Sequence, residues 1–193
     1  MIPRPSPQET SYALYGVWRL ARLDPSGLSY LEETEEAFWK SFFAAVICVP
    51  FYVVLVVVQL GQVELGAGAV KIFAVETINY VISWVAFPLV AWHLSQMLNR
   101  QENYIRYIVA FNWAKVIQFL IFLPFVLAGA AGLFGDLRGL ITLGATVLIL
   151  AYIWYITKHG LGVDGGPAAG LVIIDLFISI AVDLVAKSMI VAS

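Results

Sequence analysis

Ionisable and amide side chains recur at helical spacing inside three long apolar segments of this chain. Residues three or four positions apart share one face of a helix, so each set would point in one direction. Ionisable groups at membrane depth are costly and normally face a bundle interior or a water-filled cavity. The three sets are Glu76, Asn79 and Ser83; Asn112, Lys115 and Gln118; and Asp175, Ser179, Asp183 and Lys187.

Two kinds of chemistry could use these groups. Carboxylates and a lysine in a membrane bundle are the usual parts of a proton or ion relay. The same groups also serve as structural hydrogen-bonding partners that fix the register of packed helices. Acids and bases on facing helices neutralise one another, and the sequence has no internal repeat of the transporter kind, so the structural role is favoured. The predicted buried network consists of Glu76, Lys115, Asp175, Asp183 and Lys187.

Other sequence patterns give no indication of catalysis or of a metal site. His93 and His159 are isolated, without a second histidine four residues away or a CxxC pair. The GxGxxG match at 160–165 follows an apolar helix and not a strand, so it lacks the context of a dinucleotide site. We therefore expect a non-enzymatic protein with no catalytic residue, no metal and no cofactor.

The composition places these segments in a membrane. Of the 193 residues, 61% are hydrophobic and 12% are charged, and the mean hydropathy is +0.87. Soluble domains carry about 25% charged residues, so much of this surface must face lipid. The net charge of -2 argues against a nucleic-acid partner, which would require a basic face. Cys48 is the single cysteine, so no intramolecular disulfide can form.

Five apolar segments are long enough to cross a bilayer as helices. A hydrocarbon core of about 30 Å needs roughly 20 residues at a rise of about 1.5 Å each. The second, third and fifth segments would turn their polar faces towards one another, and the first and fourth would mainly meet lipid. The sequence predicts an all-α bundle of five transmembrane helices over 38–60, 70–97, 104–128, 138–157 and 168–191.

The segment before the first span has the pattern of a helix that lies in the headgroup layer. Residues 9–23 place apolar side chains, Trp18 among them, at helical spacing. Arg19 and Arg22 supply a basic side to the same helix. This make-up predicts an amphipathic interfacial helix.

A capping box predicts where the next helix begins. Ser29 stands three residues before Glu32, after a turn at 24–27, and a helix from this point would run into the first span. Its first turns would hold an acidic cluster, which is either a solvated face or a docking site for a partner protein. The chain thus divides into an N-terminal segment, residues 1–37, and a transmembrane domain, residues 38–193.

The basic residues favour one orientation in the membrane, because lysine and arginine concentrate on the cytoplasmic side. The N-terminal segment and the second and fourth loops share one side, and that side holds Arg4, Arg19, Arg22, Lys40, Arg100, Arg106 and Lys158. The other side holds Lys71, Arg138 and Lys187. The sequence predicts a multi-pass plasma-membrane protein, as in the bacterial inner membrane, with a cytoplasmic N-terminus and an external C-terminus.

The predicted topology resembles that of the Yip1 family of small membrane proteins. The likeness covers residues 38–191 and includes no match to the family's DLYGP-like sequence. The stretch AFWKSFF, residues 37–43, at the entry to the first span is also similar to bacterial membrane proteins of unassigned role. The resemblance implies a non-enzymatic protein with a role in membrane organisation.

We therefore expect a membrane protein that acts as a scaffold, an accessory subunit or an assembly factor. The alternative is a small transporter or a proton or ion channel that uses a buried network of glutamate, lysine and aspartate. The expected partners are the lipid bilayer and either further copies of the chain or other subunits of a larger membrane complex.

Overall fold

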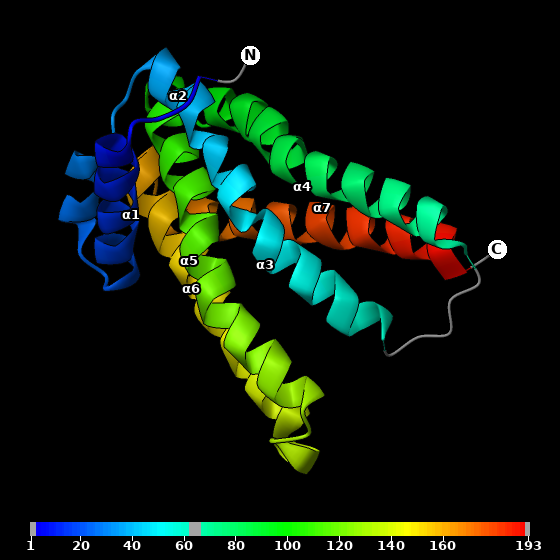
Figure 1. Ribbon diagram of the computed structural model, residues 1–193. Helices are drawn as coiled ribbons and strands as arrows, with labels where there is room; N and C mark the ends of the chain where they lie inside the picture. Colours follow the sequence, from blue (N-terminus) through cyan, green and yellow to red (C-terminus); the bar gives the residue numbers. More distant parts are fainter. Residues whose placement is uncertain (1–2, 62–66, 192–193) are drawn as a thin grey trace.

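The computed structural model describes residues 3–61 and 67–191, which form helices and no strand (Figure 1). Within these residues, five helices are long and apolar enough to span a membrane, so the predicted all-α fold is confirmed. Most of the connection between the first two predicted spans lies outside the described residues. The five helices are α3 (Phe43–Leu60), α4 (Ala69–Met97), α5 (Tyr104–Ala130), α6 (Arg138–Leu161) and α7 (Gly165–Val191).

Shorter helices precede and connect the five long ones. Two α-helices and a 3-10 helix form the N-terminal segment, and two 3-10 turns lead into α5 and α6. These elements are α1 (Pro7–Ala21), η1 (Pro25–Tyr30), α2 (Glu35–Ser41), η2 (Gln101–Asn103) and η3 (Gly135–Leu137).

A capping box starts α1 slightly earlier than predicted. The Ser6 side chain accepts a hydrogen bond from the backbone N–H of Glu9, and the Glu9 carboxylate accepts one from the backbone N–H of Ser6. Pro7 occupies the first turn, where its missing N–H costs nothing. The sequence thus predicted a helix in this region, and a helix is present; its start is fixed by the capping box.

The second helix does not begin at Ser29, so that prediction is wrong. The Ser29 hydroxyl donates to the carbonyl of Ser26 within η1. The helix begins at Glu35 instead, because the Thr34 side chain accepts from the backbone N–H of Ala37 and caps it. Part of the acidic cluster does lie in its first turn, where the helix dipole favours negative charge.

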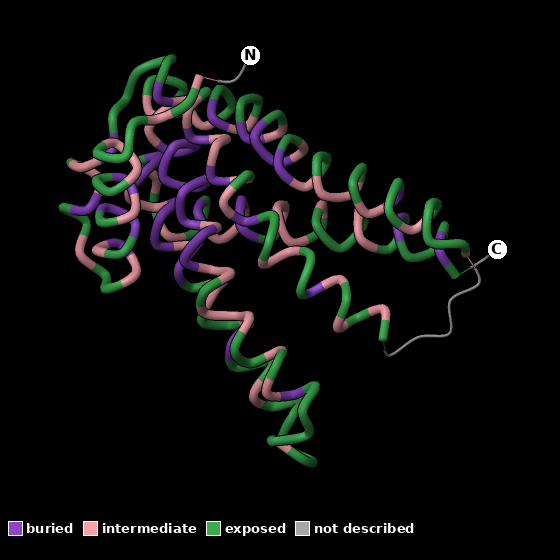
Figure 2. The backbone as a smooth tube through the Cα atoms, viewed as in Figure 1, coloured by how far each residue is buried: buried purple, intermediate pink, exposed green. Residues whose placement is uncertain are grey.

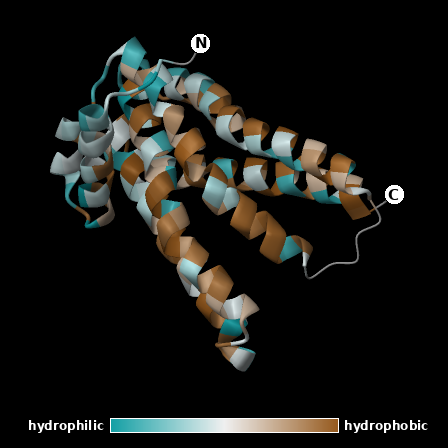
Figure 3. Cartoon of the chain, in the orientation of Figure 1, coloured by the Kyte–Doolittle hydropathy of each residue, from teal (hydrophilic) through white to brown (hydrophobic). Residues whose placement is uncertain are grey.

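The long helices form two pairs that diverge from a common end (Figure 1). α5 packs along α6, α4 packs along α7, and α3 packs against α5. Buried residues concentrate at the common end (Figure 2). The diverging halves are largely hydrophobic (Figure 3), as surfaces that meet lipid must be.

The first half of α5 is the centre of the packed end. Every residue from Tyr107 to Ala114 is buried. Consecutive residues of a helix point in all directions, so this stretch must be surrounded by protein on every side. Its neighbours are α1, α2, α3, α4 and α6.

The N-terminal segment packs on the side of this core. Val17 and Leu20 of α1 are completely buried. The Tyr152 hydroxyl of α6 donates to the carbonyl of Val17 at 2.8 Å, and the Tyr155 hydroxyl donates to the carbonyl of Leu23 at 2.7 Å. The segment is therefore a cap that is hydrogen-bonded to the bundle.

An ion pair joins α1 to α2 and makes the cap sensitive to acid. Lys40 Nζ lies 2.8 Å from Glu9 Oε1 and 2.7 Å from Glu36 Oε1. The hydrogen bonds from Lys40 and from the backbone of Ser6 lower the pKa of Glu9 from 4.5 to about 2. A folded-state pKa below the unfolded one stabilises the fold above the unfolded pKa, and that stabilisation is lost as the pH falls from about 4.5 towards 2.

We expect pepsin to cleave the N-terminal segment up to about fivefold faster as the pH falls through this window, since exposed ion pairs contribute about 1 kcal/mol at most. Glu9→Gln should remove the pH step, whereas Glu32→Gln, at an exposed glutamate, should keep it. Cleavage rates of the detergent-solubilised protein, corrected for pepsin's own pH profile, measure the effect. An unchanged step in Glu9→Gln would contradict the assignment.

Candidate functional site

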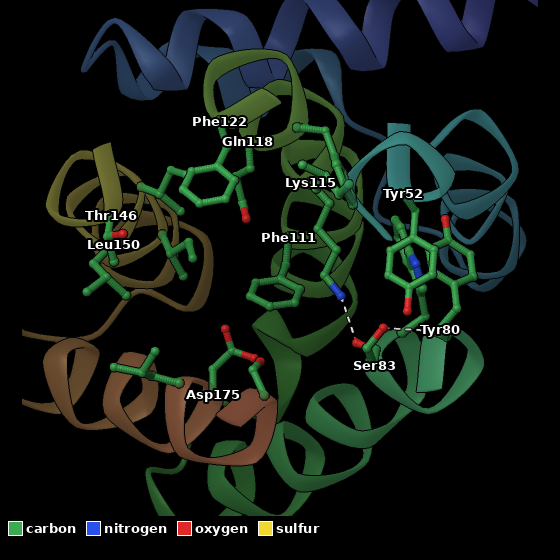
Figure 4. A pocket seen from close by; sticks show the side chains of 17 residues that line it. Tyr52, Tyr80, Ser83, Phe111, Lys115, Gln118, Phe122, Thr146, Leu150 and Asp175 are labelled. Atoms are coloured by element: carbon green, nitrogen blue, oxygen red, sulfur yellow. Dashed lines mark hydrogen bonds between the residues drawn. The ribbon is translucent and has the colours of Figure 1, made fainter. Parts of the chain in front are cut away.

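A cavity of about 350 Å³ lies among the long helices, and all five contribute to its wall (Figure 4). Most of the wall is aromatic or aliphatic, including Trp84, Phe111 and Phe119. Eight of the seventeen lining residues also carry a polar group. They are Tyr52, Tyr80, Ser83, Lys115, Gln118, Thr146, Asp175 and Ser179.

Lys115 is the cation of this cavity. Its Nζ donates to the backbone carbonyl of Ser83 at 3.0 Å. It also lies 4.4 Å from the ring centroid of Trp84 and 5.2 Å from that of Phe111. The carbonyl and the ring faces both offer negative potential to the ammonium, which partly compensates its removal from water.

Asp175 of α7 points into the same cavity (Figure 4). Lys115 and Asp175 both belong to the predicted network, and the structure does bring the two side chains into one space. However, the ion pairs formed by described residues, counted to 4.0 Å, include neither of them. The two charges therefore share a cavity without direct contact.

Glu76 and Asn79 of α4 bind a tyrosine of α3. The Tyr52 hydroxyl donates to Glu76 Oε2 at 2.6 Å, and Asn79 Nδ2 donates to the same hydroxyl at 3.1 Å. The first span was expected mainly to meet lipid, and this contact shows that it also supplies a polar tie. A tyrosine in mid-span is the sequence signal for it, because a buried hydroxyl requires a partner.

Asp183 and Lys187 pair with each other along α7. Their side chains are 2.6 Å apart and about half exposed, at 47% and 54% respectively. Neither residue lines the cavity. Of the five residues of the predicted network, the structure thus brings Lys115 and Asp175 together, keeps Asp183 with Lys187, and ties Glu76 to α3.

Asn112 and Gln118 each hold a buried polar atom without a hydrogen-bond partner among the described residues. Asn112 is completely buried, and its Nδ2 donates to the Ser41 hydroxyl at 2.9 Å. Its Oδ1 has no partner. The amide of Gln118 points into the cavity (Figure 4), and its Nε2 is the second such atom. Ser179, which the sequence also singled out, lines the opposite wall.

Helix α1 and the residue after it present two different faces. Trp18 is 50% exposed and Arg22 is exposed as well, so both remain available to a headgroup layer. Arg19 is engaged within the cap, because its guanidinium binds the Asp24 carboxylate and donates to the Tyr30 hydroxyl at 3.0 Å. The opposite face of α1 packs on α5 and α6, a contact that was not predicted from the sequence.

Tyr52→Phe is expected to destabilise the contact between α3 and α4. The change leaves the Glu76 carboxylate without its hydroxyl donor, and such a loss at a partly buried group costs about 1–3 kcal/mol. Thermal unfolding in detergent micelles measures the effect. Tyr12→Phe is the matched control, since that tyrosine is 51% exposed and its loss should cost less than about 0.5 kcal/mol. Equal midpoints for the two variants would contradict the role of Tyr52.

Comparison of the chain with protein-family models, with curated proteins and with solved structures finds no match. Among the described residues, no cluster of three or more His, Cys, Asp or Glu side chains could hold a metal ion. The functional conclusion therefore depends on the geometry of the helices and of the cavity.

Proposed function

We propose that this chain is a non-enzymatic multi-pass membrane protein that acts as an accessory subunit, scaffold or assembly factor of a larger membrane complex. The supporting observation is that polar side chains within the bundle bind neighbouring helices. Tyr52 binds α4, Asn112 binds α2, and Lys115 binds a carbonyl of α4. Polar groups used in this way fix helix register and partner choice.

The proposed location is a plasma membrane, as in the bacterial inner membrane, with a cytoplasmic N-terminus and an external C-terminus. The end of the bundle that carries α1 also carries the α4–α5 and α6–α7 connections, since Asn103 donates to the carbonyl of Leu161 and Arg106 lies 3.6 Å from Glu33. Basic residues are enriched at this end, which supports the orientation. The topology, which resembles that of the Yip1 family, supports a role in membrane organisation.

Purification from native membranes in a mild detergent tests the accessory role. We expect other membrane proteins, or further copies of the chain, to co-purify at fixed stoichiometry and to be identified by mass spectrometry. A monomer without partners, both in detergent and after cross-linking in the membrane, would contradict the proposal.

A second candidate is a small transporter or a proton or ion channel that uses Glu76, Lys115, Asp175 and Asp183. The observation in its favour is that Lys115 and Asp175 face one cavity without pairing. Flux into proteoliposomes separates the two functions. A pH-dependent flux that is abolished by Asp175→Asn and preserved in Asp136→Asn, at an exposed residue of η3, would favour transport.

A further inference from the structure

The cavity contains two opposite charges that are separated from each other. Lys115 has partial compensation from a carbonyl and two rings. The Asp175 carboxylate accepts no hydrogen bond from the described residues. Buried charges are expensive unless they are paired and hydrogen-bonded. A ligand that supplied both an anion and a cation would therefore stabilise the site most.

The N-terminal cap gives a reference level for the depth of the cavity in the membrane. Tyr152 and Tyr155 of α6 contact the cap, whose arginines and Asp24 require water or headgroups around them. Leu150 and Thr146 line the cavity within roughly 3–14 Å further along the same helix, at about 1.5 Å per residue. Along α6 the cavity thus begins close to the residues that contact the cap. If the cap lies at the headgroup layer, the polar part of a phospholipid can reach this level.

We propose that the cavity binds the headgroup of a zwitterionic phospholipid with a primary amine, with its phosphate against Lys115 and its ammonium against Asp175. A lysine binds phosphate as a point charge, and a primary ammonium offers three N–H donors to a carboxylate. The ring faces of Trp84 and Phe111 lie beside the Lys115 ammonium and hold it at the wall of the cavity. The volume of about 350 Å³ is within the range of small-molecule pockets.

The chemistry of the site also sets its selectivity. An anionic headgroup would bring a negative charge towards Asp175 without an ammonium to offset it. A trimethylated ammonium keeps its charge but has no N–H to donate to the carboxylate. The apolar wall, which includes Phe119 and Ile149, provides a surface for the first carbons of the acyl chains.

Native mass spectrometry of the full-length protein tests the proposal, with titration of lipids that share one pair of acyl chains. We expect phosphatidylethanolamine to bind at least about tenfold more tightly than phosphatidylcholine or phosphatidylglycerol, which corresponds to about 1.4 kcal/mol. Equal affinity for the three lipids would overturn the proposal. A second titration uses free phosphoethanolamine, which is the headgroup without its acyl chains. If it binds as tightly as the lipid, the site belongs to a soluble ligand instead.

Substitution of each of the two charged residues should change lipid binding in a different way. Asp175→Asn should lose the preference for phosphatidylethanolamine and gain affinity for phosphatidylglycerol, because Lys115 remains. Lys115→Met should weaken the binding of both lipids about tenfold or more. Lys115→Arg should retain the wild-type order of lipid affinities, and it remains informative if Lys115→Met fails to fold. Asp136→Asn controls for the loss of a carboxylate outside the cavity. Wild-type selectivity in Asp175→Asn would overturn the proposal.

The accessory role and the lipid site can fail separately. Absence of protein partners with intact lipid selectivity contradicts the proposed function alone. Equal binding of all lipids with intact partners contradicts the lipid site alone.

Discussion

Asn112→Asp is expected to destabilise the protein by about 3–5 kcal/mol at neutral pH. Asn112 is completely buried, and its one hydrogen bond is donated to the Ser41 hydroxyl. A carboxylate cannot donate that bond, and the Ser41 proton is already given to the carbonyl of Phe38. The variant would therefore place an uncompensated charge in the core of the packed end, which has a cost of this size.

Asn112→Leu is the matched control for that variant. It removes the unpartnered Oδ1 together with the amide donor, and leucine has the same branching and the same number of side-chain heavy atoms. Replacing a poorly satisfied polar group by an apolar one of the same shape is nearly neutral, so we expect a change of less than about 1 kcal/mol. Thermal unfolding and unfolding by SDS in mixed micelles measure both variants. If the aspartate variant were as stable as the leucine variant, water would have to reach position 112, which would contradict its burial in the core.

Gly27→Val is expected to detach the N-terminal cap from the bundle. A Cβ at Gly27 would overlap the carbonyl oxygen of Gly16 and would lie 3.0 Å from the backbone nitrogen of Leu20. Both atoms belong to the backbone of α1, so they cannot rotate away as a side chain would. Overpacking against fixed atoms costs about 3 kcal/mol, enough to expose the contact between α1 and η1.

Limited proteolysis with a neutral protease checks this result, because a detached cap should be cleaved at least about tenfold faster. Gly170→Val is the control, since a Cβ there meets nothing within 4 Å. Similar cleavage of the two variants would mean that the close approach of Gly16 and Gly27 does not hold the cap.

The spans could be predicted from the sequence because their signal is local. The length of the apolar run alone predicted a span over 70–97, and the observed helix α4 runs over Ala69–Met97. The start of α5 at Tyr104 was also predicted. The end of α6 was placed at 157 and lies at Leu161, because Lys158 and His159 continue the helix beyond the apolar run.

The contacts of the candidate site were harder to predict, because they depend on which helices are neighbours. Helical spacing put Lys115 and the aspartates on polar faces of their helices, but spacing does not fix which side chains of two helices meet. Tyr52 was missed because a tyrosine in an apolar run also fits a lipid-facing position. The buried face of α1 was missed because Val17 and Leu20 pack against helices that lie far along the chain. An apolar helix face would look the same in the sequence if it met lipid.

The hydrogen bond between the Tyr152 hydroxyl and the carbonyl of Val17 joins residues that are 135 positions apart. At about 5–20 residues per second, a ribosome completes the second partner roughly 7–27 s after the first. The N-terminal helix is therefore made long before its binding site exists. During that interval the apolar face of α1 lacks the α6 part of its binding site, so the cap can reach its final position only after α6 has been made.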